Sequence, residues 1–130
     1  MKKNIETVAL IHIKDKKLLL VRPKSKKIFY MPGGKRDEGE DNLKALIREI
    51  KEEIGLISEI KKLIGVYRID NDPRGVHLDI IYEGELNGEI KLSQEHQKSG
   101  LFNPDELPEK IAYKHKEAIE DWYKKGSQYD

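Results

Sequence analysis

Residues 34–56 read GKRDEGEDNLKALIREIKEEIGL, and this stretch decides how the rest of the chain is interpreted. Its apolar residues recur every three to four positions, which predicts one apolar stripe along a helix. The stripe consists of Leu43, Leu46, Ile47, Ile50 and Ile54. Asp41 or Asn42 can cap the start of this helix, and Gly55 suits the left-handed position at its end. The sequence therefore predicts a helix from Asp41 to Ile54.

Three glutamates follow one face of this helix. Glu49, Glu52 and Glu53 stand at i, i+3 and i+4, so their carboxylates lie beside one another at the edge of the apolar stripe. Clustered carboxylates repel each other unless a cation neutralises them, and hard divalent ions such as Mg²⁺ prefer such oxygen ligands. Arg48, one turn before Glu52, can pair with it. The alternative is an ordinary solvated acidic face with ion pairs.

The spacing around these glutamates favours the metal site. The pattern G-x5-E-x7-R-E-U-x-E-E-x-G-U, with U a bulky apolar residue, is met at every position, and a chance match is on the order of one in a million. It is filled by Gly34, Glu40, Arg48, Glu49, Ile50, Glu52, Glu53, Gly55 and Leu56. This segment resembles the Nudix box of the Nudix hydrolases and covers 23 of the 130 residues.

The resemblance implies a fold, a reaction and a metal site. The fold would be α+β, an α/β/α sandwich with a mixed central sheet, and the reaction would be hydrolysis of a nucleoside diphosphate linked to another moiety. The implied cofactor is Mg²⁺, with Mn²⁺ as an alternative. Its ligands would be Glu49, Glu52, Glu53 and the carbonyl of Gly33. Arg48 would orient a glutamate, and Glu40 would support the loop or an outer metal.

The general base of this reaction is left open by the sequence. Metal ions neutralise a pyrophosphate and lower the pKa of a coordinated water, and a nearby carboxylate can take the proton of that water. Several members of the family carry this base in a loop, and Glu95 lies in the matching region ahead of Leu101 and Phe102. Glu95 could equally be an ordinary loop residue, with Glu52 or Glu53 acting as the base.

Candidate substrate contacts lie on the segments around the box. Arg22 ends an expected strand where a cation could meet a phosphate, with an exposed salt bridge as the alternative. Tyr30 or its neighbour Phe29 could stack on a base, although at least one of them is expected in the core. Phe102 has the same two readings, with core packing favoured.

The residues after the box favour one class of substrate. Nudix enzymes that act on ADP-ribose tend to carry a proline fifteen to seventeen residues beyond the box, and Pro73 lies 17 positions after Leu56. Arg74 follows it in a D-P-R-G turn, which is also ordinary turn chemistry. ADP-ribose or a nucleoside-diphosphate sugar is therefore the favoured substrate. A nucleoside triphosphate pyrophosphatase, including one for oxidised nucleotides, and a non-catalytic nucleotide sensor are the alternatives.

Length and composition limit the remaining possibilities. A chain of 130 residues fits one Nudix domain, 1–130, and 25 basic against 24 acidic residues leave a net charge of +1. Nucleic acid and membranes are therefore not expected as partners. The absence of cysteine excludes thiolate metal sites. With no signal or membrane segment recognised, we expect a cytoplasmic monomer or homodimer acting on a nucleotide.

Periodicity and turn residues predict the other elements. Strands are expected at 7–13, 17–21, 28–31, 57–69, 76–86, 89–92 and 101–102, and a second helix at 112–125. Pro32, Gly33 and Gly34 are expected to interrupt regular structure. The second helix is expected to bury His115, Ala118, Ile119 and Trp122.

Overall fold

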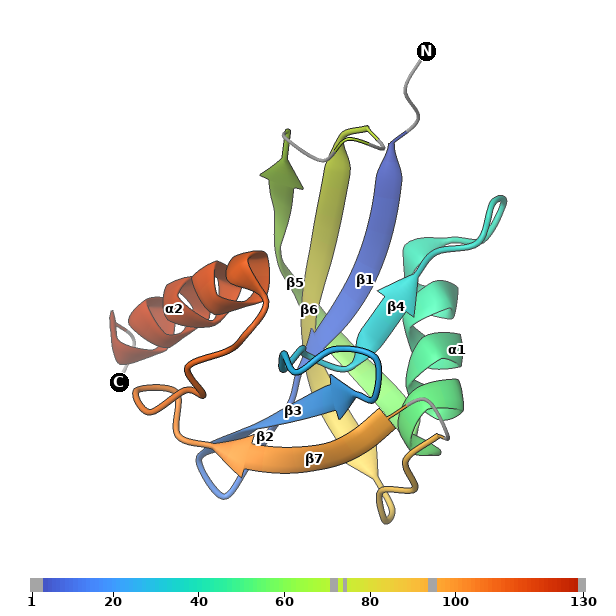
Figure 1. Ribbon diagram of the computed structural model, residues 1–130. Helices are drawn as coiled ribbons and strands as arrows, with labels where there is room; N and C mark the ends of the chain where they lie inside the picture. Colours follow the sequence, from blue (N-terminus) through green and yellow to red (C-terminus); the bar gives the residue numbers. More distant parts are fainter. Residues whose placement is uncertain (1–3, 71–72, 74, 94–95, 129–130) are drawn as a thin grey trace.

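The computed structural model describes residues 4–70, 73, 75–93 and 96–128, which form seven strands and two helices (Figure 1). In chain order the elements are β1 (Ile5–Ile11), β2 (Ile13–Lys14), β3 (Lys17–Pro23), β4 (Gly33–Lys35), α1 (Asn42–Ile54), β5 (Ile57–Ile69), β6 (His77–Asn87), β7 (His96–Phe102) and α2 (Tyr113–Gln128). Within this part of the chain, no helix is long and apolar enough to cross a membrane.

The strands form two sheets between the two helices. The larger sheet has the order β4-β1-β6-β5 and is mixed, because β1 runs parallel to β6 while the other pairs are antiparallel. The smaller sheet, β2-β3-β7, is antiparallel. Helix α1 lies on the side of β4 and α2 on the opposite side, near β5 (Figure 1). This arrangement confirms the expected α+β sandwich with a mixed sheet.

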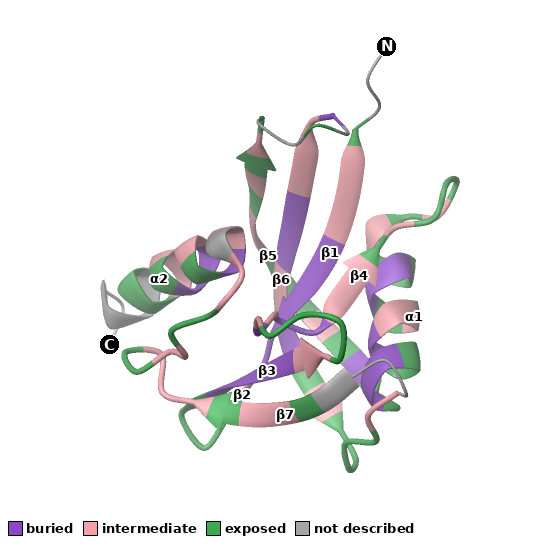
Figure 2. Ribbon diagram, viewed as in Figure 1, coloured by how far each residue is buried: buried purple, intermediate pink, exposed green. Residues whose placement is uncertain are grey.

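Two apolar cores fill the spaces between the layers (Figure 2). Successive residues of a strand point to opposite faces, so β1 directs Val8 and Leu10 into the core under α1 and Ala9 and Ile11 into the core under α2. The α2 core also contains Ala118 and Ile119, as expected for this helix, and Trp122 packs at its edge. Strand β1 is therefore apolar on both faces.

Helix α1 begins and ends at the predicted signals. The side chain of Asp41 accepts a hydrogen bond from the backbone N–H of Lys44 at 2.8 Å, and Gly55 ends the helix with φ 72°. The predicted apolar stripe is partly wrong, because Leu43 is 46% and Ile47 is 40% exposed. The buried face is rotated toward the box carboxylates and consists of Ala45, Leu46, Ile50, Glu53 and Ile54.

Four predictions for strand segments differ from the structure, and the first is the strand expected at 101–102, which runs from His96 to Phe102 as β7. Residues 28–31 make only isolated bridges, in which Tyr30 pairs with Val21 and Phe29 with Ile111. The Pro-Gly-Gly segment does not interrupt the structure, because residues 33–35 pair with β1 as β4. Residues 89–92 form no strand, since this segment runs past the end of α1, where the N–H of Lys91 donates to a helix carbonyl at 2.8 Å.

Candidate active site

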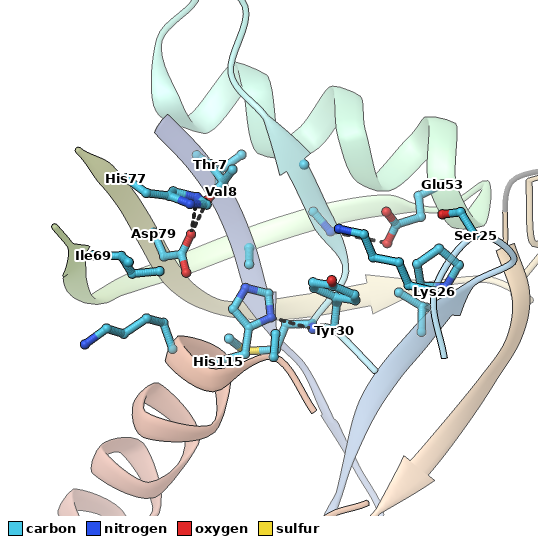
Figure 3. A pocket seen from close by; sticks show the side chains of 18 residues that line it. Thr7, Val8, Ser25, Lys26, Tyr30, Glu53, Ile69, His77, Asp79 and His115 are labelled. Atoms are coloured by element: carbon cyan, nitrogen blue, oxygen red, sulfur yellow. Dashed lines mark hydrogen bonds and ion pairs between the residues drawn. The ribbon is translucent and has the colours of Figure 1, made fainter. Parts of the chain in front are cut away.

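A cavity of about 400 Å³ lies between the larger sheet, the 23–34 segment and α2 (Figure 3). Its walls include apolar residues of both sheets, such as Val8, Val21 and Ile69. Gly33, Gly34 and Glu53 lie at one end, and His77, Asp79 and His115 lie at the other. The cavity therefore joins the box to a polar group that the box does not contain.

Two glycines allow the box to pack closely against β1. A Cβ atom on Gly33, which has φ 154°, would lie 2.0 Å from the carbonyl oxygen of Val8. A Cβ atom on Gly34 would lie 2.3 Å from Oε2 of Glu49. The backbone of β1 therefore requires glycine at position 33, whereas a larger residue at position 34 would displace the carboxylate of Glu49. In return, the N–H of Gly33 donates to Oε1 of buried Glu53 at 3.3 Å.

Arg48 organises the remaining carboxylates of the box. Its Nε and Nη2 atoms donate to the two carboxylate oxygens of Glu40 at 2.8 and 2.9 Å, a two-pronged contact. Nη1 donates to Glu49 at 3.0 Å and to Glu52 at 3.2 Å, and Nη2 reaches the carbonyl of Lys35 at 3.3 Å. Arg48 thus contacts Glu40, Glu49 and Glu52 at once.

The electrostatic environments of two box glutamates differ. The hydrogen bonds from Arg48 hold the pKa of Glu40 at about 2. Burial instead raises the pKa of Glu49, against the opposing charge of Arg48. Glu40 is therefore fully compensated by protein donors, while Glu49 has a desolvated carboxylate that a bound cation would stabilise.

The box residues supply the oxygen ligands that a divalent ion prefers, although their carboxylates do not surround a single metal position. Among the residues that the structure describes, no group of three carboxylates or histidines is close enough to hold a metal. In this structure Glu52 is 61% exposed and its carboxylate contacts Arg48 at 3.2 Å, so the expected convergence of the three glutamates is not seen. The candidate ligands are nevertheless hard oxygens, which Mg²⁺ and Mn²⁺ prefer. Two of the carboxylates, those of Glu49 and Glu53, are partly desolvated.

The structure brings only some predicted substrate residues to the cavity. Tyr30 lines it, with its ring edge-on to His115 at 5.8 Å. Arg22 does not line it, because its guanidinium lies 5.7 Å from the ring centre of Phe29 on the other side of β3. Phe102 also packs on Phe29, at 5.1 Å, in the α2 core. The predictions for Arg74 and Glu95 lie outside the described residues.

Four polar residues of the cavity were not identified as a group from the sequence. They are Thr7 of β1, His77 and Asp79 of β6, and His115 of α2. Thr7 and Asp79 are partners in the parallel β1–β6 pair, although 72 positions separate them. In the sequence, Thr7 and Asp79 stand out only as polar residues within apolar strands. This pattern does not show that the two strands are neighbours in the sheet.

Comparison with known proteins identifies the family. Residues 3–122 match the family model described as the NUDIX domain, and the chain belongs to the Nudix family. Over 114 residues it is 40% identical to an ADP-ribose pyrophosphatase of Methanocaldococcus jannaschii, covering 84% of this chain and 67% of that protein. It is 31% identical to a putative 8-oxo-dGTP diphosphatase of Bacillus subtilis, covering 88% and 75%. A crystal structure of a MutT Nudix hydrolase from Burkholderia pseudomallei superposes with TM-score 0.84 at 26% identity, covering 92% of this chain and 98% of that one.

The protein is therefore a Nudix pyrophosphohydrolase, an enzyme of a family that generally uses divalent metal ions and acts on nucleotides. When bound, the metal would neutralise the pyrophosphate and make a coordinated water more acidic. The chain supplies the remaining parts of the site. Arg48 donates to Glu49, the Gly33 N–H donates to Glu53, and apolar residues such as Val8 and Ile69 line the adjoining cavity.

Proposed function

We propose that the protein hydrolyses the diphosphate bond of ADP-ribose, or of a closely related nucleoside-diphosphate sugar, with Mg²⁺. The observation that carries this proposal is the cavity that runs from Glu53, at the box, past apolar residues such as Val8 and Ile69 and past Lys26 and Lys114, to a polar end at Asp79 (Figure 3). A metal-bound diphosphate at the box would leave one neutral nucleoside to occupy the cavity. The 40% identity to an ADP-ribose pyrophosphatase supports the choice of substrate.

The roles proposed for the box residues follow from their contacts. Glu49, Glu52, Glu53 and the carbonyl of Gly33 would hold the metal, and Arg48 would keep Glu49 in position. Either Glu53 or Glu52 would act as the base among the described residues, and Glu95 remains a candidate outside them. Among the described residues a single contact, at 3.2 Å to Arg48, holds Glu52, so its carboxylate would be able to rotate toward the other two.

A nucleoside triphosphate pyrophosphatase is the alternative. Its support is the 31% identity to a protein named as a putative 8-oxo-dGTP diphosphatase. Such an enzyme would release pyrophosphate, whereas an ADP-ribose hydrolase releases AMP and ribose 5-phosphate.

The test is a panel of substrates with the purified protein in Mg²⁺ and, separately, in Mn²⁺. The panel contains ADP-ribose, an ADP-hexose, NADH, diadenosine polyphosphates, dNTPs and 8-oxo-dGTP, with products separated by chromatography. We expect the highest kcat/KM for ADP-ribose and no turnover after chelation of the metal. A higher kcat/KM for a triphosphate, with release of pyrophosphate, would replace this proposal with the alternative.

A further inference from the structure

The end of the cavity opposite Glu53 carries a second carboxylate. Asp79 is buried, and its Oδ1 atom accepts the hydroxyl hydrogen of Thr7 and lies 2.9 Å from Nε2 of His77. Both of these partners engage the same oxygen. The side chain of Asp79 is directed toward the ring of His115, which also lines the cavity (Figure 3). The other oxygen, Oδ2, therefore remains available as an acceptor toward the cavity.

A backbone hydrogen bond determines which ring nitrogen of His115 accepts and which donates. The N–H of Met31 donates to Nδ1 of His115 at 2.9 Å, so Nδ1 must carry the lone pair. Burial lowers the pKa of His115 to about 4, and the ring is neutral at pH 7. A neutral imidazole with its lone pair on Nδ1 carries its hydrogen on Nε2. His115 is thus a fixed donor at Nε2.

These two groups form a donor next to an acceptor. In the described part of the chain, no hydrogen bond joins His115 to Asp79, although the charge of Asp79 opposes the lowering of the His115 pKa by burial. Asp79 and His115 together therefore suit a ligand with a hydrogen-bond donor, which would face Asp79, next to an acceptor, which would face His115. A phosphate does not satisfy this requirement, because a buried carboxylate repels it.

We propose that Asp79 and His115 recognise the base edge of the nucleotide, with Asp79 accepting from the exocyclic amino group of adenine and His115 donating to the adjacent ring nitrogen. This inference rests on the proposed function for its choice of adenine. The apolar walls formed by Val8 and Ile69, with Tyr30 beside His115, suit the faces of a planar base. Thr7 and His77 are positioning residues that hold Asp79.

The test compares two ligands that differ only in the amino group. Dissociation constants are measured in Mg²⁺ for AMP and for purine riboside 5′-monophosphate, which lacks the 6-amino group. We expect the unchanged protein to bind AMP about tenfold more tightly, because the analogue leaves Asp79 without its donor. Equal constants, or no binding of AMP, would overturn the proposal without any variant having to fold.

Variants then assign the preference to residues. Asp79→Asn should reduce the AMP preference to about twofold or less, since the amide no longer presents only acceptors. Asp121→Asn is the matched control, because Asp121 on α2 accepts from Tyr67 at 2.9 Å outside the cavity and should leave the preference unchanged. A preference that survives Asp79→Asn would contradict the role of Asp79.

Two replacements separate recognition by His115 from structural support. Asparagine places an oxygen near the position of Nδ1 and can still accept from Met31, whereas glutamine places an amide N–H near the position of Nε2. Recognition predicts tight AMP binding by His115→Gln and about tenfold weaker binding by His115→Asn. The reverse order would show that His115 only supports the loop.

These experiments distinguish failure of the base-recognition proposal from failure of the proposed ADP-ribose hydrolysis. An AMP preference that depends on Asp79, in a protein that does not turn over ADP-ribose, would retain this inference and reject the function. Turnover of ADP-ribose without discrimination between the two monophosphates would do the opposite.

Discussion

The two ends of the cavity hold carboxylates by different means. At the α1 end, the permanently charged guanidinium of Arg48 donates to Glu40, Glu49 and Glu52. At the β6 end, the hydroxyl of Thr7 and the imidazole of His77 hold Asp79. The first group reaches solvent, with Glu52 61% exposed, whereas Asp79 is only 6% exposed.

From this difference we expect the α1 end to serve catalysis and the β6 end to serve selection of the substrate. The box carboxylates at the α1 end are the proposed metal ligands, so changes there should lower kcat. Asp79 at the β6 end lies at the opposite end of the cavity from the box and presents an acceptor in a fixed position, so changes there should alter binding of the substrate and raise KM. The predictions below test this division, with ADP-ribose as the substrate.

The largest effect is expected for Glu53→Gln at the α1 end. Replacing a proposed metal ligand removes several kcal/mol of transition-state stabilisation, so kcat should fall on the order of a thousandfold. The affinity for AMP should change little, because the β6 end is intact. Steady-state kinetics and AMP binding check both parts.

Glu59→Gln is the control for this substitution, because Glu59 is an exposed glutamate paired with Lys61 at 2.8 Å on β5. It should leave kcat within about twofold of the unchanged protein. Wild-type turnover by Glu53→Gln at saturating Mg²⁺ would show that the metal is held elsewhere.

The second effect concerns the free energy of unfolding at acidic pH, which should decrease over a different pH range for each end of the cavity. The pKa of His115 falls from 6.5 to about 4 on burial, with Asp79 opposing and His77 adding to the shift. Between these values the unfolded chain binds a proton that the folded chain does not, so stability decreases as the pH falls from 6.5 to 4. The expected loss is on the order of 3 kcal/mol. At the α1 end, the pKa of Glu40 is lowered from 4.5 to about 2, so its contribution is lost only below pH 4.5.

Urea unfolding at pH 7.0 and 4.5 measures this effect. His115→Asn keeps an acceptor for Met31 but does not titrate, so its stability should depend less on pH over this interval. An identical pH dependence in the variant would assign the acid sensitivity to other groups.

The sequence predicts the α1 end of the cavity far better than the β6 end. Box residues lie within one helix turn of each other or in the adjoining loop, so helix geometry alone places Arg48 next to Glu49 and Glu52. Thr7 and Asp79 meet only because β1 and β6 are parallel neighbours, and that pairing is set by the packing of the whole sheet.

The errors within the predicted elements have the same cause. Periodicity placed Leu43 and Ile47 in the core, but the sheet contacts a face of α1 that includes Glu53 instead. Glycine weakens strand propensity, so the sequence does not predict strand β4, whereas in the structure only glycine fits at position 33 against the backbone of β1. Local propensity describes the elements, and tertiary packing decides which face of each element is buried.

The third effect is expected for Arg48→Lys at the α1 end. Lysine retains the charge but cannot donate to both oxygens of Glu40 and to Glu49 at once. Less precise placement of Glu49 should lower kcat about tenfold with little change in AMP binding. Arg68→Lys, at an exposed ion pair with Asp70, is the control. Equal kinetics for the two variants would mean that Arg48 contributes charge alone.

The smallest effect is expected for Thr7→Val at the β6 end. Valine has nearly the shape of threonine but cannot donate to Asp79, so the carboxylate is held by His77 alone. The loss of one hydrogen bond, about 1 kcal/mol, should raise KM about fivefold and leave kcat unchanged. Thr7→Ser keeps the hydroxyl and should restore KM. A fall in kcat with constant KM would show that the two ends act together in the chemical step, because a group that only holds the base-binding carboxylate cannot change the rate after the substrate is bound.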